Sequence, residues 1–287
     1  MTFRLTTMTA AMAALALTPA CAESKAAPVA DREAMEQVVR EYILENPEII
    51  EEALIKLSAK QQAAASQEAQ KAIASNFDAI YNNENDYFIG PADAEITVVE
   101  FFDYRCGWCK RSVEWIQALP EDYDGNVRVV FKELPIFGGI SETASLAALA
   151  AGKQGKYREF HLALMAIKNN DDLTEAKLDE VARDVGMNVQ KMRADMGSID
   201  IQRKLSESKQ LARAVGVEAT PSFLIGNEFI EGANRDRLNE AIKAEIKAIL
   251  NEKFGIGHST LEFEHPDHAH DGAAVYGHPE EPHKHSH

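Results

Sequence analysis

The chain has 287 residues, of which 45% are hydrophobic and 26% are charged, as in a soluble globular protein with one large or two modest domains. Its formal net charge is −16, and no basic stripe offsets this charge. The charge disfavours nucleic acid as a partner, and it disfavours docking on an anionic lipid surface.

The first 22 residues have the features of a secretory signal peptide. Arg4 supplies a basic start, and the apolar stretch from Leu5 to Leu17 is too short to span a bilayer. Ala20-Cys21-Ala22 is a cleavage site of the A-x-A kind, so we expect the mature chain to begin near Glu23 in the periplasm. In the alternative, Cys21 is a lipidated cysteine, although the three residues before it fit a lipoprotein signal poorly.

Residues 23–82 are predicted to form a helical arm. Apolar residues recur at helical spacing after Asp31, the expected N-cap, and Asn46-Pro47 ends this first helix. A second helix begins at Glu48, and acidic residues in its first turns suit the helix dipole. An apolar stripe on a thin helix needs burial, so we expect residues 31–74 to form a homo-oligomer, with a trimer as one arrangement. The alternative is a cap that packs on its own domain.

A polar, turn-rich linker from Asn82 to Pro91 precedes the first predicted core strand, Ile96 to Phe102, which is apolar on both faces. Glu100 interrupts this strand, and a carboxylate in a buried strand is costly unless it is partnered or protonated. We expect Glu100 to lie beneath the motif that follows, with a raised pKa, and to relay protons. The alternative is that strand alternation turns this side chain to solvent.

Cys106-Gly107-Trp108-Cys109 follows the strand and precedes a stretch with helical spacing. A helix that starts at Cys106 directs free N–H groups and the positive end of its dipole at the first sulfur, which favours the thiolate. One alternative is half of a zinc site, which needs two further ligands, and another is a structural disulfide, whose tiny loop stabilises little. Without Cys21 the mature chain has only these two cysteines, so we predict a redox pair that acts on other proteins' disulfides.

The second predicted strand runs from Asn126 to Phe131, and residues 141–211 have the pattern of helices without a strand. His161 lies in this helical region, and we expect a half-buried helix residue rather than a catalytic one. Ser141 and Asn188 are the expected N-caps of two of these helices, and another helix is expected to start with Thr174.

Thr220-Pro221 begins a short apolar stretch that is predicted to be a strand, where proline is tolerated because its first residue needs no ladder N–H. Gly226-Asn227 is a hairpin turn signal, and the returning strand covers Phe229 to Gly232. A last helix is expected from about Asn234.

Residues 253–287 change in composition and hold eight of the nine histidines, among Pro, Gly and acidic residues, so we expect no packed core there. One interpretation is weak binding of Zn²⁺ or Cu²⁺ by imidazoles, and the alternative is a solvated tail with incidental histidines. No other cofactor is expected. The candidate metal ligands are His265, His268, His270, His283, His285 and His287.

The sequences Val-Glu-Phe-Phe-Asp-Tyr-Arg-Cys-Gly-Trp-Cys and Thr-Pro-Ser-Phe, in this order of elements, resemble the thioredoxin-like fold in its DsbA form. The resemblance covers residues 90–252. It implies an α/β fold with a thioredoxin-like domain at 83–137 and 212–252 and an inserted helical domain at 138–211.

Residue by residue, the resemblance implies that Cys106 is the exposed attacking cysteine and Cys109 the buried resolving one. Glu100 falls on the family's buried acid. Thr220-Pro221 falls on a loop with a cis peptide bond, and this loop contacts the substrate together with Gly107 and Trp108.

The arm is similar to the N-terminal helices of copper-sensitivity suppressor ScsC proteins, some of which are trimeric isomerases. Gly107-Trp108 replaces the Pro-His of the strong oxidase, and threonine before the proline also occurs in isomerases, so both departures favour isomerase or reductase use. The resemblance thus implies an exported thiol-disulfide oxidoreductase that forms, isomerises or reduces disulfides in unfolded or misoxidised proteins, with a membrane redox partner. A metal-handling protein and an assembly adaptor are the alternatives.

Overall fold

The computed structural model describes residues 29–256, so the predicted signal peptide, Cys21 and the histidine-rich tail lie outside the described residues. Contacts divide the chain into two units, 1–62 and 63–287. In the first unit, α1 (Val29–Glu45) ends at Asn46-Pro47 as predicted, and α2 (Glu48–Ser75) begins directly afterwards and extends into the second unit. The prediction that Asp31 is an N-cap is wrong, because α1 already includes the two residues before it.

The second unit is built on one five-stranded sheet with the order β1-β3-β2-β4-β5. The central pair β2 and β3 is parallel, and the other three pairs are antiparallel. The bounds are β1 (Tyr87–Ile89), β2 (Ile96–Phe102), β3 (Val127–Glu133), β4 (Ser222–Ile225) and β5 (Glu228–Glu231). β2 has the predicted bounds, whereas β1 lies in the predicted linker, since a three-residue edge strand is too short to show a periodic pattern.

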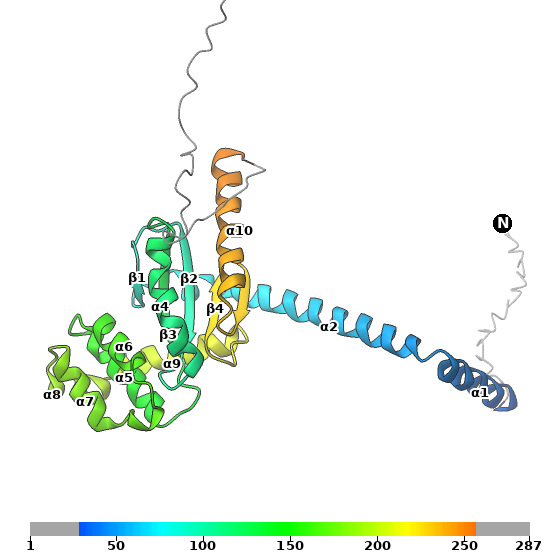
Figure 1. Ribbon diagram of the computed structural model, residues 1–287, viewed down its shortest axis with the longest axis horizontal. Coiled ribbons are helices and arrows are strands. Elements are labelled where there is room, and N and C mark those ends of the chain that lie inside the picture. Colours follow the sequence, from blue (N-terminus) through cyan, green and yellow to red (C-terminus); the bar gives the residue numbers. More distant parts are fainter. Residues whose placement is uncertain (1–28, 257–287) are drawn as a thin grey trace, which may run out of the picture. The chain divides into compact units, whose positions relative to one another are not determined.

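Helices cover both faces of this sheet (Figure 1). Near the sheet lie α3 (Phe77–Tyr81), α4 (Gly107–Asp122) and α10 (Arg235–Phe254). Between β3 and β4 the chain forms an all-helical insertion, as predicted, with α5 (Ile140–Gly152), α6 (Tyr157–Met165), η1 (Asn170–Asp172), α7 (Glu175–Asp184), α8 (Val189–Met196) and α9 (Ile199–Ala214).

Of the two N-caps predicted in the insertion, Asn188 is confirmed, and the expected start of a helix at Thr174 is an N-cap as well. Side-chain oxygens of Thr174 and Asn188 each accept a hydrogen bond from the backbone N–H three residues later, at the starts of α7 and α8. The prediction for Ser141 is wrong, because α5 begins one residue earlier, after Gly139 at φ +51°. The Ser141 hydroxyl instead donates to the carboxylate of Asp103 at 2.8 Å.

Alternate residues of β2 enter two different cores. Val98 and Phe102 pack with α4 and α10, while Val99 and Phe101 pack with the end of α2, α3 and α9. Because both faces of β2 are covered, strand alternation offers no route to solvent. Glu100, on the face of Val98 and Phe102, is therefore buried with 4% of its surface exposed.

The arm joins the sheet domain earlier than predicted. Ile73, Ile80 and Tyr81 are buried in the second core, and the Tyr81 hydroxyl donates to the carbonyl oxygen of Gly226 at 2.9 Å. The end of α2 and all of α3 thus belong to the sheet domain, whereas the arm was expected to continue to residue 82. The sequence carries no break here, because α2 is one continuous helix. Within residues 29–256, no helix combines the length and the apolar character needed to cross a membrane.

Candidate redox site

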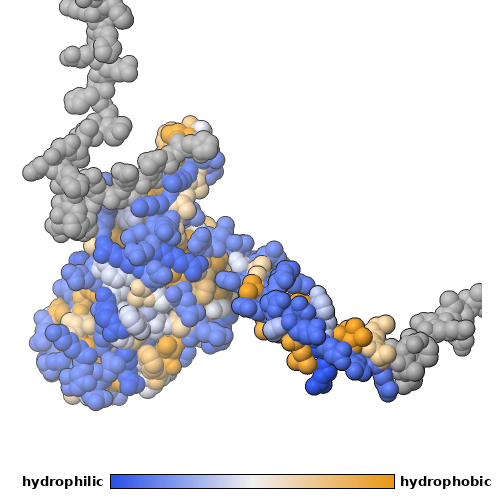
Figure 2. Space-filling view, turned by 45° about the vertical axis from the view of Figure 1, so that its right-hand side comes forward, coloured by the Kyte–Doolittle hydropathy of each residue, from blue (hydrophilic) through white to orange (hydrophobic). Residues whose placement is uncertain are grey.

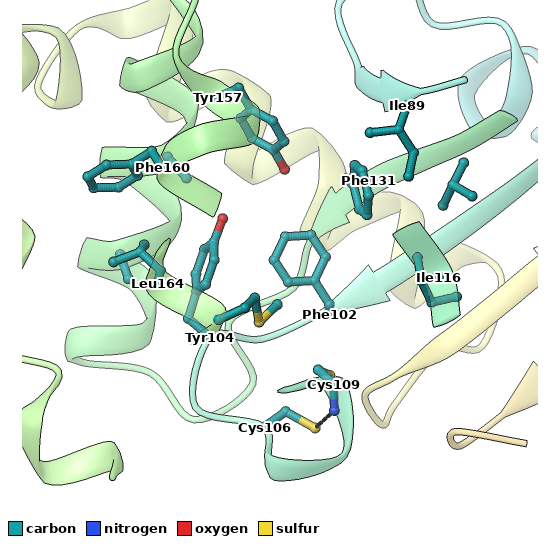
Figure 3. Packing of buried hydrophobic residues seen from close by; sticks show 14 of the residues in the cluster. Ile89, Phe102, Tyr104, Cys106, Cys109, Ile116, Phe131, Tyr157, Phe160 and Leu164 are labelled. Carbon is teal, nitrogen blue, oxygen red and sulfur yellow. Dashed lines mark hydrogen bonds between the residues drawn. The ribbon is translucent and has the colours of Figure 1, made fainter. Parts of the chain in front are cut away.

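The two cysteines lie where β2 ends and α4 begins. Cys106 is the N-cap residue of α4, and its sulfur accepts a hydrogen bond from the backbone N–H of Cys109 at 3.3 Å (Figure 3). Both cysteines are free thiols, so the structure represents the reduced pair. A sulfur in the N-cap position meets the unpaired N–H groups of the first helical turn and the positive end of the helix dipole.

The two sulfurs differ strongly in acidity. A hydrogen bond from the Cys109 side chain is the largest cause that lowers the pKa of Cys106 to about 6, against an opposing effect of burial. Burial raises the pKa of Cys109 well above its usual range, and the hydrogen bond to Cys106 and the charge of Glu100 raise it further. At neutral pH, Cys106 is therefore the nucleophilic thiolate and Cys109 is a protonated thiol.

The attacking cysteine is less open than the resemblance implied. Cys106 exposes 4% of its surface and Cys109 exposes none. Access to the sulfur is limited by the loop before β4, in which the Thr220–Pro221 peptide bond is cis, as the resemblance implied. The Cys106 thiol donates to the carbonyl oxygen of Thr220 at 3.1 Å, so this loop lies directly against the sulfur.

Glu100 lies on the same face of β2 as the cysteine-bearing helix. Burial, and to a smaller extent the charge of Cys106, raise its pKa to about 8. A carboxyl group with this pKa exchanges its proton near neutral pH. The burial and the raised pKa of Glu100 agree with the prediction, and its charge interacts with both sulfurs. Its role as a proton relay stays a prediction.

Asp103 shapes the turn before Cys106, and the sequence analysis missed it. Its buried carboxylate accepts hydrogen bonds from the backbone N–H of Arg105 at 2.7 Å and of Phe137 at 3.1 Å, and from the Ser141 hydroxyl. Its backbone carbonyl accepts from the N–H of Cys106 at 3.0 Å. One side chain thus joins the redox turn to the chain that enters the insertion. Its place directly after a buried strand was the available signal.

A second connection comes from Asn170 in η1. Its side-chain amide donates to the carbonyl oxygen of Arg105 at 2.7 Å, and its side-chain oxygen accepts from the ammonium group of Lys110 at 2.7 Å. The same ammonium donates to the carbonyl oxygen of Ile167 at 2.6 Å. The insertion therefore holds the redox motif on both sides, one residue before Cys106 and one residue after Cys109.

His161 is buried rather than half-buried. It exposes 2% of its surface, its Nδ1 lies 3.1 Å from the Tyr104 hydroxyl, and burial lowers its pKa to about 3. The neutral His161 ring contacts Phe102, Tyr104 and Tyr157, and it packs the insertion against the sheet. Nearby, the Tyr157 hydroxyl donates to Glu133 at 2.6 Å, and burial raises the pKa of that carboxyl to about 7.

Residues 29–256 contain no group of three or more His, Cys, Asp or Glu side chains that could hold a metal ion. The six histidines predicted as ligands lie outside the described residues, so that hypothesis stays a prediction.

Two family models match the chain. One described as Thioredoxin matches residues 82–244, and one described as Copper resistance protein ScsC N-terminal domain matches residues 31–64. Among curated proteins, "Na(+)/H(+) antiporter NhaA 3" of Salinispora tropica is 28% identical over 55% of this chain. The matched region covers only 24% of the length of that antiporter. "Probable disulfide bond formation protein D" of Bacillus cereus is 28% identical over 55% of this chain and 78% of its own length.

Solved structures show similar chains. A thioredoxin-like oxidoreductase from Silicibacter pomeroyi is 36% identical, with a TM-score of 0.56, over 59% of this chain and 97% of its own. ScsC of Proteus mirabilis in a transitional conformation is 29% identical, with a TM-score of 0.56, over 77% of this chain and 100% of its own. The thiol-disulfide exchange protein α-DsbA2 from Wolbachia pipientis is 25% identical, with a TM-score of 0.58, over 64% and 98%.

Proposed function

Since the chain belongs to the thioredoxin family, as a DsbA-like thiol-disulfide oxidoreductase of the ScsC type, we propose that it is an exported enzyme that isomerises or reduces disulfides in other proteins. The observation that carries this proposal is the split acidity of Cys106 and Cys109. The lowered pKa of Cys106 keeps it as the thiolate that attacks disulfides at neutral pH. The raised pKa of Cys109 keeps the second sulfur protonated until it resolves the mixed disulfide.

The proposed reaction begins with attack of the Cys106 thiolate on a substrate disulfide. A mixed disulfide forms between Cys106 and one substrate sulfur, and the other substrate sulfur leaves as a thiolate. In isomerisation, a substrate thiolate attacks the mixed disulfide, forms a new substrate disulfide and releases the Cys106 thiolate. No net electron transfer occurs.

In reduction, Cys109 resolves the mixed disulfide. Its thiol gives a proton to the Glu100 carboxylate and its sulfur attacks the sulfur of Cys106, which forms the Cys106–Cys109 disulfide and releases the reduced substrate. Two electrons pass to the substrate, and a membrane redox partner restores the dithiol. Oxidation of a substrate is the same sequence in reverse.

The arm is proposed to assemble the enzyme through a second copy of itself. Large apolar side chains are exposed along α1 and the start of α2, among them Met35 at 65%, Val38 at 65%, Tyr42 at 57% and Leu54 at 60% (Figure 2). Apolar residues exposed in such density on helices are typical of an interface. The match of residues 31–64 to the ScsC N-terminal domain supports this proposal, for which a trimer is one arrangement.

The test compares refolding of scrambled ribonuclease with oxidation of reduced ribonuclease by the full mature chain. We expect scrambled ribonuclease to regain activity faster than reduced ribonuclease is oxidised. Cys106→Ser removes both activities, and Cys109→Ser accumulates mixed disulfides with the substrate. Full activity of Cys106→Ser refutes the mechanism, and oxidation without isomerisation refutes the proposed direction.

Metal handling by the histidine tail is the second candidate, favoured by the copper-resistance description of the model that matches the arm. Calorimetric titration of Zn²⁺ and Cu²⁺ compares the mature chain with a chain that ends at Lys253. Equal uptake by both chains excludes the tail as the binding site.

A further inference from the structure

Two arginines flank the redox motif, and each lies over an aromatic ring. The guanidinium carbon of Arg111 is 3.8 Å from the ring centroid of Trp108. One terminal nitrogen of Arg111 lies 3.6 Å from the place where a Cβ at Gly107 would stand. This side chain is therefore folded back over the dipeptide between the two cysteines. On the other side of Cys106, the guanidinium carbon of Arg105 is 6.0 Å from the ring centroid of Phe137.

Neither guanidinium has a carboxylate partner in the described part of the chain. The ion pairs between residues 29 and 256 include neither arginine. The Nε atom of Arg105 is buried without a hydrogen-bond partner. In a chain with 46 acidic and 30 basic residues, two arginines without an ion pair, one directly before Cys106 and one two residues after Cys109, concentrate positive charge around the redox motif. The carboxylate of Asp103, two residues before Arg105, is already engaged by two backbone N–H groups and a hydroxyl.

The rings beneath these arginines are open to solvent. Trp108 is 60% exposed, Phe137 is 53% exposed, and the adjacent Ile136 is 43% exposed. A guanidinium stacked on a ring uses its flat face, and its N–H groups point outward in the plane, where they match a carboxylate. The redox site therefore has exposed apolar rings with an arginine over each of them, and neither arginine forms an ion pair with a residue between 29 and 256.

We propose that Arg105 and Arg111 make this enzyme select protein segments with an acidic residue close to the reacting cysteine. The proposal rests on the thiol-disulfide exchange function and names the substrate class of the same site. In the mixed disulfide, the substrate sulfur is bonded to Cys106, which lies between the two arginines in the sequence. Each extended residue of the substrate advances by about 3.3 Å, so side chains one or two residues from its cysteine reach these cations.

The test uses ten-residue peptides with one cysteine, activated as mixed disulfides with thionitrobenzoate. Reduced full mature protein releases the yellow thionitrobenzoate anion when Cys106 attacks. The peptides carry Asp, Asn or Lys at one or two residues on either side of the cysteine. Each rate is divided by the rate with dithiothreitol, which removes the effect of the peptide charge on the reactivity of its own disulfide.

We expect Asp peptides to react about threefold to tenfold faster than Lys peptides, with Asn peptides between them, as for one or two exposed charge pairs. The ratio falls toward one in Arg111→Gln and Arg105→Gln and in 0.5 M NaCl. The ratio of two peptides within one variant is independent of any change in the acidity of Cys106. The matched control is Arg183→Gln, an exposed arginine of α7, which keeps the wild-type ratio.

Equal normalised rates for all peptides overturn the substrate preference while the exchange function stands. A preference that survives both arginine substitutions also overturns it, because the selectivity then comes from other residues. Absence of thionitrobenzoate release from every peptide, with full release by dithiothreitol, refutes the exchange function itself.

Discussion

Replacing Glu100 with glutamine tests whether a buried, ionisable carboxyl group stands beneath the sulfurs. The substitution keeps the shape of the side chain and removes its titration. In the folded protein the pKa of Glu100 is raised to about 8, chiefly by burial, whereas the unfolded chain has the ordinary value of about 4.3. The folded state therefore binds the proton more tightly than the unfolded state between these two values.

The sign of the effect on stability follows from this difference. A carboxyl group with a raised folded pKa contributes its full stability below the unfolded pKa, and this contribution is lost as the pH rises toward 8. At about 1.4 kcal/mol for each pH unit, the loss approaches 4 to 5 kcal/mol as an upper bound for this shift. Glutamine has no proton to lose, so the free energy of unfolding of Glu100→Gln does not show this loss as the pH rises.

The assay is urea unfolding of the reduced protein at pH 5 and at pH 8.5. We expect Glu100→Gln to gain at least 2 kcal/mol relative to wild type between these two pH values. The matched control is Glu114→Gln, the same substitution at an exposed position of α4. A difference between Glu100→Gln and wild type that is the same at both pH values refutes the argument that burial raises the pKa of Glu100.

Three further predictions follow from the site and the arm. Asn170→Ala removes the hydrogen bond to the carbonyl of Arg105 and one of the two hydrogen bonds of the Lys110 ammonium, so we expect a loss of about 1–3 kcal/mol in urea unfolding. The same variant loosens the ammonium of Lys110, whose positive charge is attracted to Cys106. We therefore expect the thiolate absorbance of Cys106 at 240 nm to titrate at higher pH than in wild type. If Asn170 only stabilises the fold, this titration is unchanged. Tyr42→Glu places a charge on the exposed apolar face of α1, and we expect a lower mass by light scattering than for wild type and for Gln37→Glu. An unchanged mass contradicts self-association through this face.

The redox motif could be recognised from neighbouring residues alone because its geometry is local. An apolar strand, a Cys-x-x-Cys and a helical pattern within about two dozen residues suffice to put Cys106 at a helix N-terminus, which is where it lies. The burial of Glu100 was an inference from apolar neighbours on both sides, and the two cores on either face of β2 account for it. The failures were also local in origin. A three-residue edge strand and a helix that continues unbroken from arm to domain leave no distinct signal in the sequence.

The sequence by itself determined the two cysteines between a strand and a helix, the all-helical insertion and the apolar character of the arm, because each depends on propensities and spacing within a few residues. The resemblance to a known family added the role of the proline loop. Only the tertiary structure decided that Asp103 holds the segment of Phe137, and that Asn170 joins Arg105 to Lys110. These partners lie 34 to 65 positions apart along the chain. Their meeting depends on how the insertion packs against the sheet, and no local pattern encodes that packing. The same packing left two arginines unpaired over exposed rings beside the reactive sulfur, where they face an incoming chain rather than a carboxylate of their own.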